Sequence, residues 1–286
     1  IKTNREGASA GPFAELDCGE SGSTLRFLLP VAGALGAECE FVMRGRLPQR
    51  PITALTECLS AHGYNVEKKE DRLFCSGRLK PGNYTIPGDI SSQFASGLLF
   101  ALPLLEREST LALTGRVESV SYIDMTLDAL RLSGADIKAE GQKYEIRPAG
   151  RFRMPKEVRV PGDWSNAAFF LVAGAIGQAS VSVTGLDPHS LQGDRAIVEV
   201  LRSFGVEITE KDGTYTAYPS ALKGQEIDAS QIPDAVPVLS VAAACARGQS
   251  RVYGAARLRL KESDRLKSTA AMISALGGRA EVTSDG

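Results

Sequence analysis

A short phrase of sequence that recurs along this 286-residue chain indicates its fold: Leu59-Ser-Ala-His-Gly63-Tyr-Asn-Val66. It joins an apolar helix end, a glycine and the start of a strand. The phrase returns as Leu130-Arg-Leu-Ser-Gly134-Ala-Asp-Ile137, Leu201-Arg-Ser-Phe-Gly205-Val-Glu-Ile208 and Ile273-Ser-Ala-Leu-Gly277-Gly-Arg-Ala280. Glycine suits the left-handed position that ends a helix. Because the four glycines are 71, 71 and 72 residues apart, we predict one structural unit repeated four times.

Each copy also contains an earlier, strongly apolar helix. We predict these helices over Thr24–Leu35, Gln93–Leu105, Asn166–Ile176 and Ala235–Ala246. A β-rich run follows each of them, so the unit reads helix, strand, helix, strand, with a further strand in most copies. This order predicts an α/β fold. Helices this apolar are expected to be buried on most sides, whereas the second helices are amphipathic and lie nearer the surface.

A stretch rich in proline and basic residues, 147–156, lies between the second and third copies and is typical of a linker. It predicts two domains, residues 1–155 and residues 156–286, with two copies in each. The chain starts at Ile1 rather than Met, and 281–286 is typical of the first strand and turn of a hairpin. We expect both ends to be truncations; a processed mature chain is the alternative.

The composition excludes several classes of protein. Lys and Arg number 33 against 34 acidic residues, a net charge of −1, so the whole chain has no electrostatic reason to bind nucleic acid. No apolar run reaches the roughly 18 residues of a membrane-spanning helix. The five cysteines form no Cys-x-x-Cys pair and there are two histidines, which argues against a disulfide framework or a metal site and favours the cytoplasm.

Polar residues precede every predicted helix. Those before the first helices are Gly19-Glu-Ser-Gly-Ser-Thr24, Ser91-Ser92-Gln93, Asp163-Trp-Ser-Asn166 and Pro233-Asp234. Those before the second helices are Arg46-Leu-Pro-Gln-Arg50-Pro51, Ser119-Val-Ser-Tyr122, Ser190-Leu-Gln-Gly-Asp-Arg195 and Lys261-Glu-Ser-Asp-Arg265. Helix capping alone accounts for Ser23, Asp163 and Asp194.

Capping does not account for the cations at these helix starts, which are Arg26, Arg50, Lys261 and Arg265. A cation near a helix N-terminus opposes the helix dipole, so several of them together indicate a compensating anion. Backbone N–H groups at a helix start already favour anions, and arginine adds a fork that matches carboxylate or phosphate. The sequence therefore predicts that the chain binds small anionic molecules.

Other motifs are weaker. The glycine-rich stretch 19–24 lacks the Gly-Lys-Ser/Thr ending of a Walker-type phosphate loop and the glycine pattern of a dinucleotide-binding loop. We interpret His189 and Trp164 as structural residues. We interpret the five cysteines as core residues, because none lies in an evident electropositive loop.

Taken together, the motifs resemble the 5-enolpyruvylshikimate-3-phosphate synthase family. The matching segments follow the family's order: Gly19-Glu-Ser-Gly-Ser-Thr-Leu-Arg26, Gly45-Arg-Leu-Pro-Gln-Arg-Pro51, Ser91-Ser-Gln-Phe94, Tyr122-Ile-Asp124, Leu191-Gln-Gly-Asp194, Ile232-Pro-Asp234 and Leu260-Lys-Glu-Ser-Asp-Arg-Leu266. The resemblance implies the enolpyruvyl transferase fold, in which βαβαββ units form two domains that face a cleft. Four of the family's six units are expected here.

The resemblance also implies an activity, which is transfer of the enolpyruvyl group of phosphoenolpyruvate to the 5-hydroxyl of shikimate 3-phosphate, on the route to chorismate and the aromatic amino acids. It implies these two small-molecule substrates, no metal or organic cofactor, and a monomeric parent enzyme. Ser91, Ser92 and Ser119 would hold the shikimate phosphate. Tyr122 would line the same pocket, and Gln93 would bridge the two substrates.

The remaining roles concern phosphoenolpyruvate and the chemistry. Three residues would contact phosphoenolpyruvate: Gly22, Arg50 and Arg265. By the same resemblance, Asp234 would orient or deprotonate the attacking hydroxyl. Lys261 and Glu262 would move protons to and from the enolpyruvyl carbons. Glycine at position 22 favours sensitivity to glyphosate.

The chain departs from the family pattern in several places. The family's N-terminal Gly-Ser-Lys-Ser motif and its C-terminal His/Asp-His-Arg segment are absent. Arg257 stands where some members have an asparagine that contacts the shikimate phosphate, so that role is not carried over. Two alternatives stay open: an inactive fragment that only binds shikimate 3-phosphate, and the related enolpyruvyl transferase that acts on UDP-N-acetylglucosamine, whose reactive cysteine loop is not seen.

Overall fold

The computed structural model describes residues 14–286; the first thirteen residues of the predicted first domain lie outside it. The chain divides into two compact units with interleaved segments. Within the described residues, the first unit is made of 14–86, Gly97–Ala112 and Asp136–Gly150, and the second of Pro87–Ser96, Leu113–Ala135 and Arg151–Gly286. The predicted boundary between residues 155 and 156 stays a prediction.

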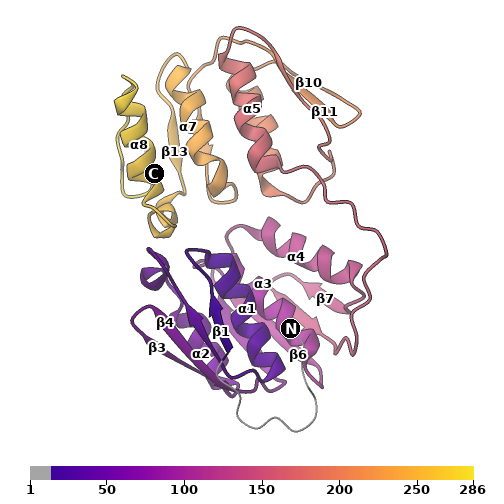
Figure 1. Cartoon of the computed structure of the whole chain (residues 1–286). Helices are drawn as coiled ribbons and strands as arrows, with labels where there is room; N and C mark the ends of the chain where they lie inside the picture. Colours follow the sequence, from indigo (N-terminus) through magenta and orange to yellow (C-terminus); the bar gives the residue numbers. More distant parts are fainter. Residues whose placement is uncertain (1–13) are drawn as a thin grey trace. The chain divides into compact units, whose positions relative to one another are not determined.

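The first copy of the repeat forms a sheet with two helices (Figure 1). Its elements are β1 (Ala14–Asp17), α1 (Gly22–Leu35), β2 (Cys39–Val42), the 3-10 helix η1 (Leu47–Gln49), α2 (Thr53–Ala61), β3 (Tyr64–Lys69) and β4 (Arg72–Gly77). The strand order is β1-β2-β4-β3. β1 and β2 are parallel, whereas β4 runs antiparallel to both β2 and β3. The copy is therefore a βαβαββ unit.

The second copy follows the same plan. Its elements are β5 (Asn83–Pro87), α3 (Ser92–Ala101), η2 (Leu102–Leu104), β6 (Ser109–Thr114), α4 (Val120–Leu132), β7 (Ile137–Glu140) and β8 (Lys143–Ile146). The strand order β5-β6-β8-β7 matches that of the first copy. Residues 147–163, which include the predicted linker, contain neither helix nor strand; their role as a linker stays a prediction.

The third and fourth copies lie in the second unit. The third consists of α5 (Trp164–Ile176), β9 (Val181–Val183), η3 (Gly193–Ala196), α6 (Ile197–Ser203), β10 (Ile208–Lys211) and β11 (Thr214–Ala217). The fourth consists of β12 (Glu226–Asp228), η4 (Pro233–Ala235), α7 (Val236–Cys245), β13 (Arg251–Tyr253), η5 (Ala256–Leu260) and α8 (Arg265–Ala275). β9, β11 and β10 form one sheet, and β12 pairs in parallel with β13. The predicted helices of all four copies are confirmed.

The repeat glycines end α2, α4, α6 and α8, as predicted. Their φ angles are +93° at Gly63, +85° at Gly134, +92° at Gly205 and +86° at Gly277. Any residue with a Cβ is disfavoured in this left-handed region. The three nearly equal spacings therefore record one conformational requirement that recurs in each unit.

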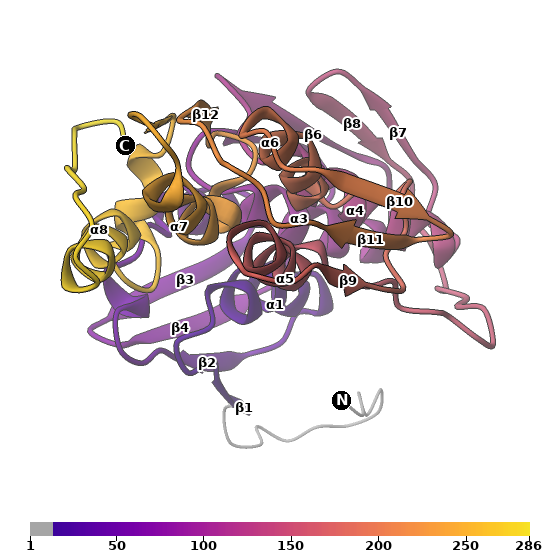
Figure 2. The same cartoon turned by 90° about the horizontal axis from the view of Figure 1, so that it is seen from above.

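The core of the third copy is built around Trp164, the first residue of α5. Trp164 is fully buried and meets the ring of Tyr215 edge-on, with 4.8 Å between ring centroids. Figure 2 shows α5 beside β9 and β11. The interpretation of Trp164 as a packing residue is confirmed. The expectation that α5 is buried on most sides is wrong in part, because Phe169 and Phe170 are 54% and 59% exposed.

The capping predictions are confirmed at one of three helix starts. The Asp163 carboxylate caps α5 by accepting from the N–H groups of Ser165 and Asn166. Ser23 does not cap α1; the helix begins at Gly22 and Ser21 is its cap. Asp194 caps nothing, because its carboxylate is turned inward to accept from the Ser165 hydroxyl.

Two further expectations need correction. Four cysteines are buried, but Cys245 is exposed because it lies at the last turn of α7. The strand expected in 281–286 does not form: Thr283 N–H donates to Gly286 O across a turn, and β12 is the only strand paired with β13 in the described chain. Within residues 14–286, no helix has both the length and the apolar character to cross a membrane.

Candidate functional site

The first group of predicted site residues gathers at the start of α1, in the first unit. A Cβ atom on Gly22 would lie 2.6 Å from Nη1 of Arg50 and 3.0 Å from Nη1 of Arg26, so only glycine lets both guanidinium groups approach the helix start this closely. Nη2 of Arg26 donates to the Pro51 carbonyl at 3.0 Å. Burial and then the Arg50 charge lower the pKa of Arg26 to about 10, so Arg26 stays cationic at neutral pH.

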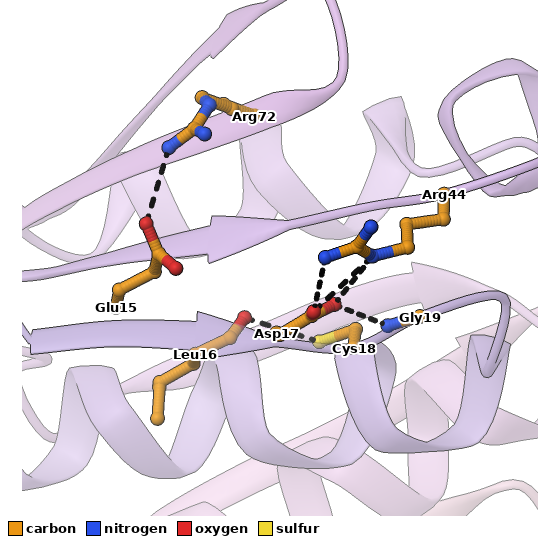
Figure 3. Close-up of polar contacts among 7 residues, drawn as sticks. All are labelled: Glu15, Leu16, Asp17, Cys18, Gly19, Arg44 and Arg72. Carbon is orange, nitrogen blue, oxygen red and sulfur yellow. Dashed lines mark hydrogen bonds and ion pairs between the residues drawn. The ribbon is translucent and has the colours of Figure 1, made fainter.

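Hydrogen bonds and an ion pair among Asp17, Gly19 and Arg44 join the two loops that carry these residues (Figure 3). The Asp17 carboxylate, at the end of β1, accepts from Nη2 of Arg44 at 2.7 Å and from the Gly19 N–H at 2.9 Å. The Arg44 N–H in turn donates to the Gly19 carbonyl at 2.8 Å. The loop after β1, which carries Gly22, is therefore fixed beside the loop after β2, which carries Arg50.

The second group gathers around Asp234, in the second unit. The Tyr122 hydroxyl, on the first turn of α4, donates to Oδ2 of Asp234 at 2.6 Å. Nη1 of Arg265, the first residue of α8, donates to Oδ1 at 2.5 Å. The two carboxylate oxygens are thus held by groups from two different helices.

The Asp234 carboxylate is kept ionised by its neighbours. Burial raises its pKa, but the Lys261 charge, the Tyr122 hydrogen bond and the Arg265 charge together outweigh burial, so the pKa lies below its ordinary value. Burial and the Asp234 charge raise the pKa of Tyr122, so the phenol remains a donor. Asp234 is therefore an anion whose position is fixed.

The segment that leads into α8 and the first residue of that helix supply three predicted residues to this group: Lys261, Glu262 and Arg265. Arg265 bridges two carboxylates, since Oε1 of Glu262 lies 2.6 Å from Nη2 while Asp234 is held by Nη1. Lys261 is near enough for its charge to act on Asp234. The Arg265 guanidinium keeps its protons and fixes the two carboxylates, whereas an ammonium and a carboxylate such as Lys261 and Glu262 are groups that can exchange protons.

The serines predicted to hold a phosphate lie at the starts of α3 and α4. The Ser91 hydroxyl accepts from the Gln93 N–H at 3.3 Å, while Ser92 and Ser119 are buried. The two loops are tied together, because Glu118 N–H donates to the Gly88 carbonyl at 3.2 Å. Ser119 has φ +55°, a strained value for a non-glycine residue, of the kind that concentrates at functional sites.

A family model described as EPSP synthase (3-phosphoshikimate 1-carboxyvinyltransferase) matches residues 2–286. The chain belongs to the EPSP synthase family. The 3-phosphoshikimate 1-carboxyvinyltransferase of Clostridium kluyveri is 42% identical over 262 residues, which are 91% of this chain and 61% of that protein. The enzyme of the same name from Clostridioides difficile is 39% identical over 99% of this chain and 65% of its own length. The chain thus spans a little under two thirds of these relatives.

Solved structures agree with the family assignment. EPSP synthase from Acinetobacter baumannii matches with a TM-score of 0.73 and 28% identity, over 97% of this chain and 64% of the other. The enolpyruvyl transferase NikO from Streptomyces tendae has a TM-score of 0.62 at 18% identity, over 80% of this chain and 56% of its own, and so shares the fold. The predicted enolpyruvyl transferase fold is confirmed.

Two residues of this EPSP synthase family chain escaped the sequence prediction as site residues. Asp194 is buried, and burial and the Asp234 charge raise its pKa. Asp194 belongs to the Leu191-Gln-Gly-Asp194 motif, and this motif is the sequence feature that could have identified it as a site residue. Arg257 donates to the Ser119 hydroxyl at 2.5 Å from a position 138 residues away, and no local pattern marks that contact. Among the described residues, no cluster of His, Cys, Asp or Glu is arranged to hold a metal ion.

Proposed function

We propose that this chain carries the substrate-binding and catalytic groups for enolpyruvyl transfer from phosphoenolpyruvate to the 5-hydroxyl of shikimate 3-phosphate, with release of phosphate. The observation that carries the proposal is the fixed Asp234 carboxylate, held by Tyr122 and Arg265 beside Lys261 and Glu262. Such a group suits a reaction in which a hydroxyl must be aimed at a carbon while protons move nearby.

The lowered pKa of Asp234 supports an orienting role. A carboxylate that holds its proton weakly makes a poor base for a free hydroxyl, yet it accepts a hydrogen bond well. Asp234 would therefore aim the 5-hydroxyl at C2 of phosphoenolpyruvate and take its proton only as the C–O bond forms.

Lys261 and Glu262 would serve the two proton transfers at C3 of the enolpyruvyl group. Addition of the hydroxyl oxygen at C2 requires a proton at C3, which gives a tetrahedral intermediate with a methyl group. Elimination of phosphate then removes a proton from that methyl group and restores the double bond. The Arg265 bridge would hold Glu262 at a fixed position during these transfers, while the guanidinium itself keeps its protons.

The remaining residues would bind the two anions. Gly22, Arg50 and Arg265 would contact phosphoenolpyruvate, and Ser91, Ser92, Gln93, Ser119 and Tyr122 would contact shikimate 3-phosphate. Two phosphorylated substrates repel each other, so fixed cations are needed to bring them within bonding distance. The same proposal includes a monomeric enzyme in the cytoplasm, to which four buried free thiols are suited.

The test is phosphate release from shikimate 3-phosphate plus phosphoenolpyruvate by the 286-residue chain. Turnover that Asp234→Asn abolishes, and that Asp212→Asn on the exposed β10–β11 turn leaves intact, would support the proposal. Tight binding of shikimate 3-phosphate without turnover would instead support the binding-only alternative. Turnover of UDP-N-acetylglucosamine in its place would overturn the assignment.

A further inference from the structure

A buried polar network joins the start of α4 to η5 within the second unit. Nη2 of Arg257 donates to the Ser119 hydroxyl at 2.5 Å and to the Ser230 carbonyl at 2.8 Å. Nε of Arg257 lies 2.7 Å from Oε2 of Glu118, and these two side chains are only 13% and 20% exposed. Burial lowers the pKa of Arg257 and the Glu118 charge opposes that shift, while the guanidinium stays protonated at neutral pH.

The network fixes the direction of the Ser119 hydroxyl. A guanidinium has only donors, whereas a hydroxyl has one donor and two acceptor lone pairs. Ser119 must therefore accept from Arg257, and its single proton points elsewhere. Within residues 14–286, no hydrogen bond is donated by this proton. Ser119 is consequently arranged as a donor toward an acceptor of another molecule.

We propose that Arg257 is a positioning residue for the phosphate group of the substrate, that it acts by holding the Ser119 hydroxyl as a donor, and that Glu118 limits the positive charge at this place. This inference rests on the proposed function, because Ser119 is there assigned to the substrate phosphate. A phosphate dianion offers only acceptors at neutral pH, which matches a hydroxyl whose lone pair is already occupied.

Glu118 and Arg257 have opposite effects under this proposal. Removal of the Arg257 charge takes away both the orientation of Ser119 and a nearby cation, so the phosphate binds more weakly. Removal of the Glu118 charge leaves the guanidinium in place and makes its surroundings more positive, so the phosphate binds more tightly. A network that only fastened α4 to η5 would weaken binding when either partner was changed.

The experiment is calorimetric titration of the full 286-residue chain with shikimate 3-phosphate and, separately, with unphosphorylated shikimate. For Arg257→Gln we expect shikimate 3-phosphate to bind about 10-fold more weakly or worse, with shikimate affinity unchanged. For Glu118→Gln we expect binding about 3-fold tighter or better. Arg202→Gln is the matched control, because Arg202 forms an exposed pair with Glu199 on α6, and its affinity should equal the parent's.

Ser119→Ala, alone and combined with Arg257→Gln, tests whether Arg257 acts through the Ser119 hydroxyl. If Arg257 acts through Ser119, the double variant should bind shikimate 3-phosphate no more weakly than the worse single variant. Arg257→Lys keeps the charge but not the fork, and serves where Arg257→Gln does not fold. Weaker binding in Glu118→Gln, or independent losses in the double variant, would overturn the inference while the proposed function stands. A parent chain that does not bind shikimate 3-phosphate would overturn both.

Discussion

Replacement of Gly22 by alanine tests the geometry at the start of α1. The added methyl group would lie 2.6 Å from Nη1 and 2.9 Å from Cζ of Arg50. An ordinary contact begins near 3.4 Å, so the guanidinium must retreat by about 0.8 Å. A hydrogen bond between Arg50 and an anion would be lost by that movement.

A hydrogen bond to a charged group contributes about 1.5–3 kcal/mol, which corresponds to about 10- to 150-fold in affinity. We therefore expect Gly22→Ala to weaken phosphoenolpyruvate binding by about that factor, measured calorimetrically with shikimate 3-phosphate present. The affinity for shikimate 3-phosphate should not change, because its predicted contacts lie at α3 and α4. The unfolding midpoint should not change either, since the displaced atoms are a side-chain end.

A double-variant cycle separates this steric effect from general damage. Arg50→Lys removes the guanidinium atoms that the methyl group meets, so Gly22→Ala should cost little in that background. Unchanged phosphoenolpyruvate binding in the single variant would show that Arg50 does not hold this substrate in the way proposed. Equal losses for both substrates would also contradict the prediction, because they would indicate a disturbed fold instead of a displaced arginine.

Three further predictions concern stability. The pKa of Asp234 lies below its ordinary value of 3.8, so the ionised carboxylate stabilises the fold above pH 3.8, and this stabilisation is lost as the pH falls below 3.8. In Asp234→Asn, the free energy of unfolding should therefore depend less on pH below 3.8. The pKa of Asp194 is raised above 3.8, so its ionised form opposes folding at neutral pH. Asp194→Asn, whose amide oxygen still accepts from Ser165, should therefore raise the free energy of unfolding at pH 7. In urea titrations this gain should disappear below pH 3.8. Asp163→Ala removes the cap of α5 and should lower the free energy of unfolding by about 1 kcal/mol, followed by the fluorescence of Trp164, the only tryptophan. An acid slope unchanged by Asp234→Asn, a loss of stability at pH 7 in Asp194→Asn, or an unaltered Trp164 transition in Asp163→Ala would each count against the corresponding interpretation.

Features fixed by local chemistry could be predicted from the sequence. The repeat glycines mark helix ends because the left-handed backbone admits glycine most easily, and that requirement is readable in one residue. The cation Arg50 was predicted to face an anion, and the structure places it against Gly22 at a helix start. The order of helices and strands followed from the same local patterns.

Features fixed by tertiary partners could not be predicted. Two serines, Ser21 and Ser23, stand two residues apart at the start of α1, and only the path of the chain selects Ser21 as the cap. A strand requires a neighbour, so the β-rich sequence of 281–286 was not sufficient to form one. The contact between Arg257 and Ser119 spans 138 residues; the family resemblance places both positions near the shikimate phosphate, but no local sequence pattern indicates the hydrogen bond between them.

Calorimetric titration with two ligands decides between the shikimate and the nucleotide-sugar assignments of this chain. The 286-residue chain is titrated with shikimate 3-phosphate and with UDP-N-acetylglucosamine under identical conditions. We predict binding of shikimate 3-phosphate that Ser119→Ala weakens, and no binding of the nucleotide sugar. Tight binding of UDP-N-acetylglucosamine together with no heat from shikimate 3-phosphate would contradict the account.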